Sequence, residues 1–332
     1  MIIDNYSFNG RFSKLCFRYI QHKRSIGYKF GERSIRAIRK MNESLSTISE
    51  NRSNDDYSIT KEVVEEFVAR KPGETPKTQE MRETVIRQFA MFLNSLSIEA
   101  YVVPTRKKSP SKFTPYIFTR EQISVIFNVI DNLEYECRSP NYHYVYPFLI
   151  RLLYCCGLRI SEALALKIED VDFDEGVLRI EQAKYNNSRL VPISGSLRKV
   201  LSKYMDQVRY SKTDKGFMFR TRWNTPYKTH SIYCRFKAFL QRANIPHTEN
   251  GRTPRLHDLR HTFAVHALEH MSTQGMDVYC SIPYLAAYMG HRKIRCTEQY
   301  LRLSAESYGG IIEALTPLYE NLFLEVDQHE EA

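Results

Sequence analysis

The chain has 332 residues, a net charge of +10 at pH 7 and an isoelectric point near 9.1. This length predicts two domains, and the apolar fraction of 42% is enough for two ordinary cores, which excludes a largely disordered protein. The charge favours an acidic partner, most commonly nucleic acid. Residues 1–112 carry +8 and residues 113–302 carry +9, whereas residues 303–332 contain seven acids and no Lys or Arg.

Cysteine usage and hydropathy limit the compartment. Seven scattered cysteines form no C-x-x-C pair, which predicts a reducing compartment and no metal site. The N-terminus lacks the apolar core of a signal peptide, and no apolar run approaches the ~18 residues needed to span a bilayer. We therefore expect a soluble, cytoplasmic protein without a membrane partner.

The first part of the chain, residues 10–97, shows four apolar stripes at helical spacing and predicts a small helical bundle. Its polar faces carry ten Lys and Arg between residues 11 and 40, interleaved with aromatic rings. That density suits contact with a phosphate backbone. The run from Val103 to Pro115 has three prolines and four cations, which favours an extended basic linker; a simple hinge is the alternative.

The second part begins with a capping-box sequence at Thr119 and Gln122. An apolar helix over about 144–156 should end at Gly157, and Ser161 is the expected cap of the next helix. Arg159 then lies in a turn beside a helix N-terminus, where an anion is favoured. A lone Arg at such a place is more often part of a structural salt bridge.

A small antiparallel sheet is expected at 171–173, 177–183 and 189–193, because turn residues separate three short apolar runs. Lys184 stands where the second strand enters its turn. A Lys on a hairpin is usually only a solvated residue, so this signal is weak alone. Helices are expected again at 196–208 and near 229–243.

Residues 254–302 hold the strongest pattern. Apolar residues recur at helical intervals around His257 and Arg260, so both side chains should project from one face. A second helix is expected from Ser281 as N-cap, with Pro283 in its first turn and a stop at Gly290. His291 follows that stop, and Tyr300 lies nine residues beyond His291. His261 and His266 are expected to be core histidines.

Six residues together supply what phosphoryl transfer without a metal requires: Arg159, Lys184, His257, Arg260, His291 and Tyr300. Guanidinium and imidazole donors can hold the non-bridging oxygens of a phosphodiester, so no metal or other cofactor is expected. Tyr300 is the candidate nucleophile, with His257 accepting its proton and Lys184 protonating the departing oxygen. Any one of the chain's 22 tyrosines is a poor candidate before the order of the whole set is considered.

These residues resemble the tyrosine recombinases, the phage-integrase family. The resemblance rests on Cys156-Gly-Leu-Arg159-Ile-Ser-Glu162, Lys184 to Ile193, His257-Asp-Leu-Arg260-His-Thr-Phe263, and Gly290-His291 with Tyr300. It implies a mainly α fold with a small antiparallel sheet (α+β). The implied domains are a helical SAM-like core-binding domain over 1–104, a linker over 105–117 and a catalytic domain with a tail helix over 118–332.

The resemblance also implies partners: double-stranded DNA with inverted-repeat core sites, three further copies of the chain in a tetramer, and accessory recombination proteins, in a bacterial cytoplasm and on the nucleoid. The segment between Arg260 and Gly290 is several residues longer than in chromosome-dimer resolvases, which favours a mobile-element integrase. Tyr185 stands where a small residue is common, so Lys184 is the weakest match. A Xer-like resolvase, a type IB topoisomerase and a non-catalytic DNA-binding relative are the alternatives.

An apolar stripe over 311–323, within an expected helix at 308–324, adjoins the acidic end of the chain. We expect this tail to dock on a neighbouring protomer and to order Tyr300.

Overall fold

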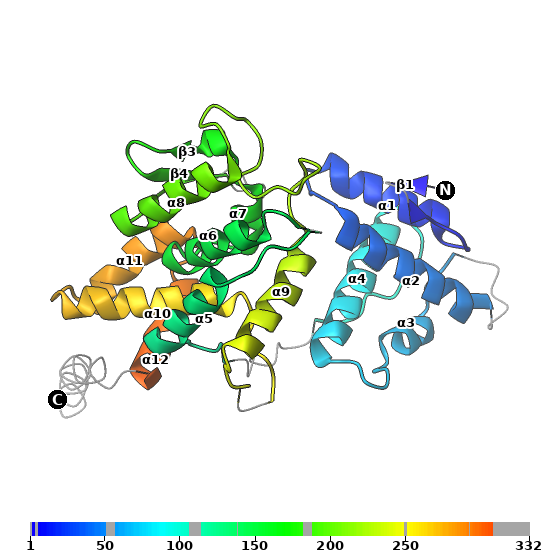
Figure 1. Ribbon diagram of the computed structural model, residues 1–332. Helices are drawn as coiled ribbons and strands as arrows, with labels where there is room; N and C mark the ends of the chain where they lie inside the picture. Colours follow the sequence, from blue (N-terminus) through cyan, green and yellow to red (C-terminus); the bar gives the residue numbers. More distant parts are fainter. Residues whose placement is uncertain are drawn as a thin grey trace, which may run out of the picture. The chain divides into compact units, whose positions relative to one another are not determined.

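The computed structural model describes residues 2–3, 6–50, 57–105, 114–137, 139–181, 188–248, 251–291 and 293–307. The chain divides into two compact units, Met1–Ser111 and Lys112–Ala332 (Figure 1). Both are mainly helical. The described residues also form a small three-stranded antiparallel sheet, which confirms the predicted fold class. No helix in the described part of the chain is long and apolar enough to cross a membrane.

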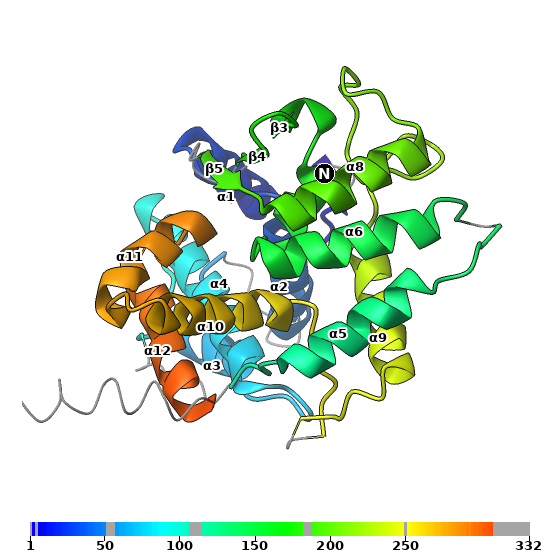
Figure 2. The same cartoon turned by 60° about the vertical axis from the view of Figure 1, so that its left-hand side comes forward.

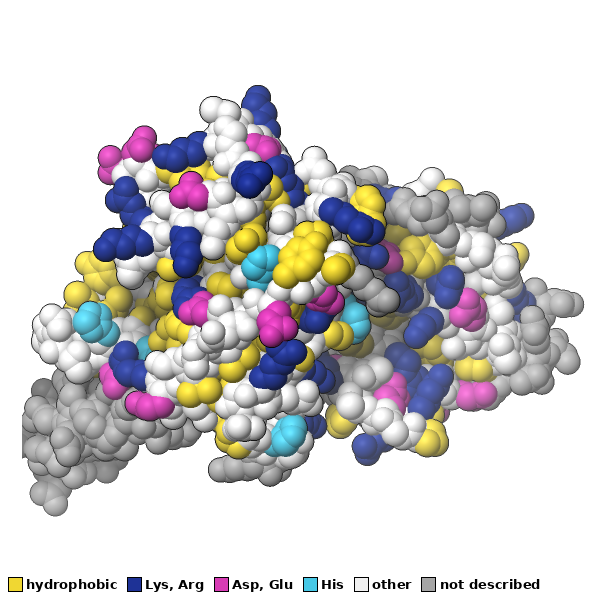
Figure 3. Space-filling model, in the orientation of Figure 1, with side chains coloured by type: hydrophobic (Ala, Val, Ile, Leu, Met, Phe, Trp, Pro, Cys, Tyr) yellow, Lys and Arg dark blue, Asp and Glu magenta, His cyan; other side chains and the backbone are white. Residues whose placement is uncertain are grey.

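The first unit is a bundle of the four expected helices: α1 (Ser13–Ser25), α2 (Glu32–Glu50), α3 (Lys61–Val68) and α4 (Pro76–Ser95). The first three bury the apolar stripes that the sequence predicts, and α4 buries Phe89, Phe92 and Leu93 of its stripe but leaves Met81 exposed. Tyr19 packs its ring against Phe30, Phe89 and Phe92 in the core. A two-stranded pair, β1 (Ile2–Ile3) and β2 (Tyr6–Ser7), was not expected. Lys and Arg side chains recur across the visible face of this unit (Figure 3).

The second unit is built around α6 (Tyr142–Cys155), whose Val145, Leu149 and Leu152 are fully buried. Its other elements are α5 (Arg120–Asp131), α7 (Ile160–Ala165), η1 (Ile168–Asp170), β3 (Val171–Asp172), β4 (Val177–Ile180), β5 (Arg189–Pro192), α8 (Gly195–Val208), α9 (Thr229–Arg242), α10 (Asp258–Thr273), α11 (Val278–Met289) and α12 (Arg295–Ser307). Helix α10 packs against α6, α11 and α12 (Figure 2), so the segment that carries the strongest sequence pattern joins the core to the C-terminal helices.

The expected sheet is present in the order β3-β4-β5, with both pairs antiparallel. Its strands are shorter than expected. Strand β3 ends at Asp172, because the carboxylate of Asp172 accepts hydrogen bonds from the backbone amides of Asp174 and Glu175 in the following turn. The pairing of Ile180 with Arg189 closes the described part of the second hairpin. Lys184, in the connection between them, lies outside the described residues.

Two predicted helix starts are wrong. Helix α11 begins one turn earlier than expected, because the side chain of Asp277 accepts a hydrogen bond from the backbone amide of Cys280 at 2.9 Å. Ser281 is therefore a buried residue inside the helix, and Pro283 lies beyond the first turn. Helix α7 has Arg159 rather than Ser161 at its N-cap. The capping box at Thr119 and the stop at Gly290 are confirmed.

Candidate active site

Arg159 enters the site from the turn between α6 and α7. Gly157 permits this turn because it has a φ of +56°, and a Cβ there would lie 2.3 Å from the ring of Phe263. The guanidinium of Arg159 donates from Nη1 to Oε1 of Glu162 at 2.7 Å, yet its side chain remains 37% exposed. This Arg can therefore keep its structural partner and still meet a ligand.

The carboxylate of Glu162 collects positive charge around the site. It is buried and accepts hydrogen bonds from Arg159 and Arg189, and Nη1 of Arg260 lies 4.0 Å from its Oε2. Burial acts to raise the pKa of Glu162, but the hydrogen bonds and charges of Arg189 and Arg159 outweigh it and hold the pKa below its usual value. Three guanidiniums thus surround one carboxylate, which leaves net positive charge for an anion.

Arg260 is 2% exposed and lies on the first turn of α10. Its Nη1 donates to the carbonyl of Gly157, and its Nη2 donates to the carbonyl of Met289 at 2.8 Å. Burial, followed by repulsion from Arg159, lowers its pKa to about 10. Arg260 therefore remains a cation at neutral pH and links the turn before α7 to the end of α11.

His291 follows Gly290, which ends α11 with a φ of +67°. The backbone amide of His291 donates to the carbonyl of Ala286, and its Nδ1 lies 2.8 Å from Oγ1 of Thr297, a fully buried residue. Burial and the charges of Arg260 and Arg159 lower the pKa of His291 to about 4. The imidazole is therefore neutral at neutral pH and held in one orientation.

Two further imidazoles come from the start of α10. His257, at the N-cap, reaches solvent, and its ring meets that of His261 edge to face with a centroid separation of 4.9 Å. Desolvation by the surrounding protein, then repulsion from Arg260 and Arg255, lowers the pKa of His257 to about 4. Burial and the charge of His257 lower the pKa of His261 to about 3.

Tyr300 lies on α12, and its side chain is 1% exposed. The hydroxyl group is 3.1 Å from Nδ1 of His261, and the ring stacks beside His291 with a centroid separation of 6.1 Å and an interplanar angle of 18°. Burial raises the pKa of Tyr300, and the charges of Arg260 and Arg159 oppose that rise. The phenol is thus protonated, and it points at an imidazole that can accept its proton.

The structure brings five of the six predicted site residues into one region of the second unit: Arg159, His257, Arg260, His291 and Tyr300. The sixth, Lys184, lies outside the described residues. His266 is a core residue as expected, with its Nδ1 2.8 Å from the hydroxyl of Tyr154.

His261 was missed. The sequence prediction places His257 at the phenolic proton and His261 in the core, whereas the hydrogen bond at Tyr300 involves His261. The available signal was spacing: His261 follows His257 by four residues, and residues four apart share a helix face.

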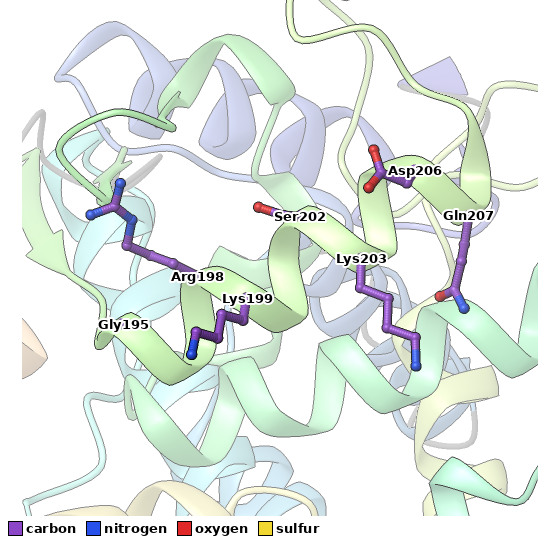
Figure 4. A pocket seen from close by; sticks show the side chains of 7 residues that line it. All are labelled: Gly195, Arg198, Lys199, Ser202, Lys203, Asp206 and Gln207. Carbon is purple, nitrogen blue, oxygen red and sulfur yellow. The ribbon is translucent and has the colours of Figure 1, made fainter.

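The donor set shows what this region can bind. No group of three His, Cys, Asp or Glu that could hold a metal ion occurs among the described residues. A separate shallow cavity of about 730 Å³ lies along α8. None of the six predicted site residues lines it, so this cavity is not part of the site. Figure 4 shows Lys199 and Lys203 of that cavity extending from one side of α8. The arginines and histidines of the site match a phosphate group better than a cation.

The family comparison agrees with this chemistry. The protein-family model described as "Phage integrase family" matches residues 117–307, which is more than half of the chain. The chain belongs to the phage integrase family. Its function is therefore site-specific recombination, and it is a DNA-binding enzyme.

Individual relatives extend the comparison beyond the second unit. The chain is 28% identical over 303 residues to a putative integrase/recombinase, y4rB, of Sinorhizobium fredii, covering 89% of this chain and 94% of the relative. Among solved structures, it resembles XerH recombinase in a post-cleavage complex with palindromic difH substrate, with a TM-score of 0.62, 17% identity, and coverage of 86% and 78%. It also resembles the Tn1549 transposon integrase in complex with transposon right end DNA, with a TM-score of 0.59, 17% identity, and coverage of 88% and 97%.

Proposed function

We propose that this integrase cuts and rejoins DNA strands through a 3′-phosphotyrosyl link on Tyr300, in the integration or excision of a mobile element. One observation carries the chemical part of the proposal. The hydroxyl of Tyr300 lies 3.1 Å from His261 and beside a positively charged cluster that contains Arg159, Arg260 and Glu162. This arrangement joins a nucleophile, a proton acceptor and an anion-binding site in one chain.

In the proposed cleavage step, Arg159, Arg260, His257 and His291 hold the non-bridging oxygens of the scissile phosphate. The oxygen of Tyr300 attacks phosphorus while its proton passes to His261. The bond from phosphorus to the 5′ oxygen breaks, and that oxygen takes a proton from Lys184. In the joining step, the 5′ hydroxyl of another strand gives its proton to Lys184 and attacks the phosphotyrosine. The bond from phosphorus to the Tyr300 oxygen breaks, and that oxygen takes back its proton from His261, so the bond energy is conserved.

In the protein without DNA, Tyr300 and His261 are in place for the proton transfer, but the transfer itself is not favoured. Tyr300 has a raised pKa and His261 has a lowered pKa, so proton transfer between them is unfavourable before DNA arrives. A bound phosphate brings negative charge next to the imidazoles, which stabilises their protonated forms. Binding of DNA should therefore raise the pKa of His261 and turn the resting hydrogen bond into a productive one.

A segment without acidic residues is the proposed DNA contact of the second unit. Residues 216–248 contain no Asp or Glu and six Lys or Arg: Arg220, Arg222, Lys228, Arg235, Lys237 and Arg242. The segment includes α9 and a tight hairpin whose tip exposes Trp223, the only tryptophan of the chain. The guanidinium carbon of Arg222 lies 4.1 Å from the centre of its ring. Positive charge next to an exposed aromatic ring suits a nucleic-acid surface.

The domain assignment remains part of the proposal. We assign DNA binding to residues 1–104, a connecting role to residues 105–117, and catalysis to residues 118–332. The basic faces of α1 and α2 support the first assignment. The boundary between the compact units falls between Ser111 and Lys112, inside the proposed linker. Residues 106–113 of that linker lie outside the described part.

A mobile-element role is favoured over the resolution of chromosome dimers. The length of the segment between Arg260 and Gly290 supports it, and so does the similarity to y4rB over nearly the whole of both chains. A Xer-like resolvase is the second candidate, because several relatives bear Xer names. A donor plasmid with the flanking ends of the element distinguishes the two: insertion or excision at those ends supports an integrase, whereas multimer resolution without them supports a resolvase.

We further propose that four copies act together on two duplexes, with accessory proteins and with exchange of the tail. Residues 308–332 lie outside the described residues, so this step rests on the apolar stripe over 311–323 and on the acidic end that follows it. Deletion of residues 308–332 should abolish recombination while binding of a single site continues. Unchanged recombination by the truncated protein would refute a role for the tail.

Covalent trapping tests the proposed chemistry directly. Wild-type protein and Tyr300→Phe are incubated with a nicked suicide duplex that carries the element's crossover site, in the presence of EDTA. We expect a denaturation-resistant adduct with the wild type and none with the variant, although both bind the duplex. An adduct that persists in Tyr300→Phe would show that another residue is the nucleophile, and an adduct that requires a divalent cation would contradict metal independence.

A further inference from the structure

Arg189 is a largely buried arginine beside Glu162, and the proposed chemistry gives it no role. It is the first residue of β5, and its side chain is 10% exposed. Nη1 and Nη2 donate to the two carboxylate oxygens of Glu162 at 3.2 and 3.0 Å, and Nε donates to the carbonyl of Tyr288 at 2.8 Å. Each of its three nitrogens therefore has a protein partner, in contrast to the partly exposed Arg159.

The contact between Arg189 and Glu162 affects Arg159, one of the arginines proposed to bind the phosphate. Glu162 also accepts hydrogen bonds from the backbone amide and Nη1 of Arg159, at 2.9 and 2.7 Å. Arg189 holds both oxygens of this carboxylate in a two-pronged contact, which fixes the plane of the carboxylate. The position of the Arg159 guanidinium is consequently set by a carboxylate that Arg189 orients.

The second link acts on the end of α11. Arg189 donates to the carbonyl of Tyr288, and Arg260 donates to the carbonyl of the next residue, Met289. Carbonyls at a helix C-terminus lack partners within the helix and carry partial negative charge, so two adjacent guanidiniums are favourable there. Gly290 and His291 follow immediately. Arg189 thus ties the strand, the carboxylate and the turn that carries His291 into one unit.

We propose that Arg189 is a positioning residue for DNA cleavage. It sets the orientation of Arg159 through Glu162 and the orientation of His291 through the Tyr288 carbonyl, without touching the scissile phosphate. This inference rests on the proposed function of the same site. It assigns to β5 a part in catalysis that does not depend on Lys184, which precedes the strand in the sequence.

The test uses the charge of the substrate. A methylphosphonate at the scissile position replaces one non-bridging oxygen by a methyl group, so the diester becomes neutral and needs less cationic stabilisation. Cleavage of the phosphodiester and of the methylphosphonate duplex is measured for wild type, Arg189→Gln and Arg189→Lys. Arg159→Gln serves as the reference for a lost phosphate contact, and Arg179→Gln, an exposed arginine on the neighbouring β4, serves as the matched control.

Arg189→Gln should slow phosphodiester cleavage by about 10–100-fold, the loss seen in metal sites when a residue that orients a metal ligand is removed, because Arg189 likewise acts through groups that contact the substrate. On the methylphosphonate the loss should be much smaller, as for Arg159→Gln. Arg189→Lys keeps the charge but cannot bridge Glu162 and the Tyr288 carbonyl with one nitrogen, so its loss should have the same substrate dependence and a smaller size. Arg179→Gln should resemble the wild type on both duplexes.

Circular dichroism and binding of the intact duplex establish whether each variant is folded. If Arg189→Gln does not fold, the inference is tested with Arg189→Lys. An equal loss on both substrates would show that Arg189 has only a structural role, and no loss would show that it has none. Either result overturns the inference while Tyr300-dependent cleavage by the wild type continues. Absence of a Tyr300-dependent adduct in the wild type would instead overturn the proposed function on which the inference rests.

Discussion

At the scale of single residues, the site is a set of groups whose charge states are fixed by their neighbours. The pKa values of His257, His261 and His291 are lowered to about 4, 3 and 4. All three imidazoles are therefore neutral at neutral pH, next to arginines that stay charged. This combination gives the site cationic groups that bind phosphate and neutral nitrogens that can accept protons.

These lowered pKa values predict that acid weakens the fold. An unfolded chain binds protons at its histidines near pH 6.5, whereas the folded site resists protonation down to about pH 4 or 3. Below about pH 6.5 the unfolded state therefore binds more protons, and the free energy of unfolding falls as the pH decreases. Thermal unfolding from about pH 7.5 to pH 4.5 should show a falling midpoint.

His261→Asn isolates one imidazole. Because Asn does not titrate in this range, the thermal unfolding midpoint of the variant should fall less steeply than that of the wild type between about pH 6.5 and pH 4.5. Above about pH 7 the imidazole is neutral in both states, so the difference between the two proteins should be constant there. Parallel curves over the whole range would contradict the lowered pKa of His261.

The turn at Gly157 supports a second prediction about a single residue. Its φ of +56° is unfavourable for other residues, and an added Cβ would lie 2.3 Å from the ring of Phe263. Its carbonyl also accepts a hydrogen bond from Arg260. Gly157→Ala should destabilise the protein by about 1–3 kcal/mol and reduce cleavage, as measured by denaturant unfolding and adduct formation.

Gly195→Ala is the matched control in the same unit. Gly195 begins α8, and a Cβ there meets nothing within 4 Å. Since Ala has the better helix propensity, this variant should be neutral or more stable by up to about 1 kcal/mol, with normal cleavage. If the two substitutions had the same effect, the turn at Gly157 would not be the constraint that the structure indicates.

At the scale of elements, the helices were predictable from their apolar spacing, and the errors lie at their ends. Asp277, one turn before Ser281, caps α11. Asp and Ser are about equally good caps, so only the folded backbone shows which of the two is used. His261 is a similar case. His261 and Tyr300 are 39 residues apart in sequence, so their contact depends on α10 packing against α12. The four-residue spacing from His257 places His261 on the same helix face but does not show which residue it meets.

The acid-free segment yields a prediction for the hairpin before α9. Trp223 is 68% exposed and is the only tryptophan, so its fluorescence reports on this hairpin alone. If the segment contacts DNA, adding a duplex with the binding site should shield Trp223 from quenching by acrylamide. Fluorescence anisotropy of a labelled duplex in the same sample measures how much protein is bound.

Trp223→Phe supplies the background signal, because it removes the only tryptophan. The shielding should disappear at high salt together with binding, as expected for contacts to phosphates. Unchanged access of acrylamide to Trp223 while the duplex is fully bound would place this hairpin outside the DNA interface.

At the scale of the whole molecule, the structure predicts which chain supplies the nucleophile. Tyr300 is buried against Val265, Leu268 and Met289 of its own chain, and its hydroxyl lies next to that chain's His261. To reach the site of a neighbouring copy, α12 would have to leave this core. The exposure of a side chain as large as Tyr300 costs about 1.5–3 kcal/mol, and loss of the hydrogen bond adds to that cost. Cleavage within the same chain is therefore favoured.

Mixing two inactive variants tests this prediction. Tyr300→Phe keeps the phosphate-binding arginines but lacks the nucleophile, and Arg159→Gln keeps the nucleophile but has a damaged site. If each tyrosine serves its own chain, the mixture should form no more adduct than Arg159→Gln alone, even where both variants bind adjacent sites on one duplex. If Tyr300 of one copy could enter the site of another, the mixture would regain cleavage, because an intact site and an intact nucleophile would meet. Exchange between copies would then involve α12 itself rather than only the tail beyond it.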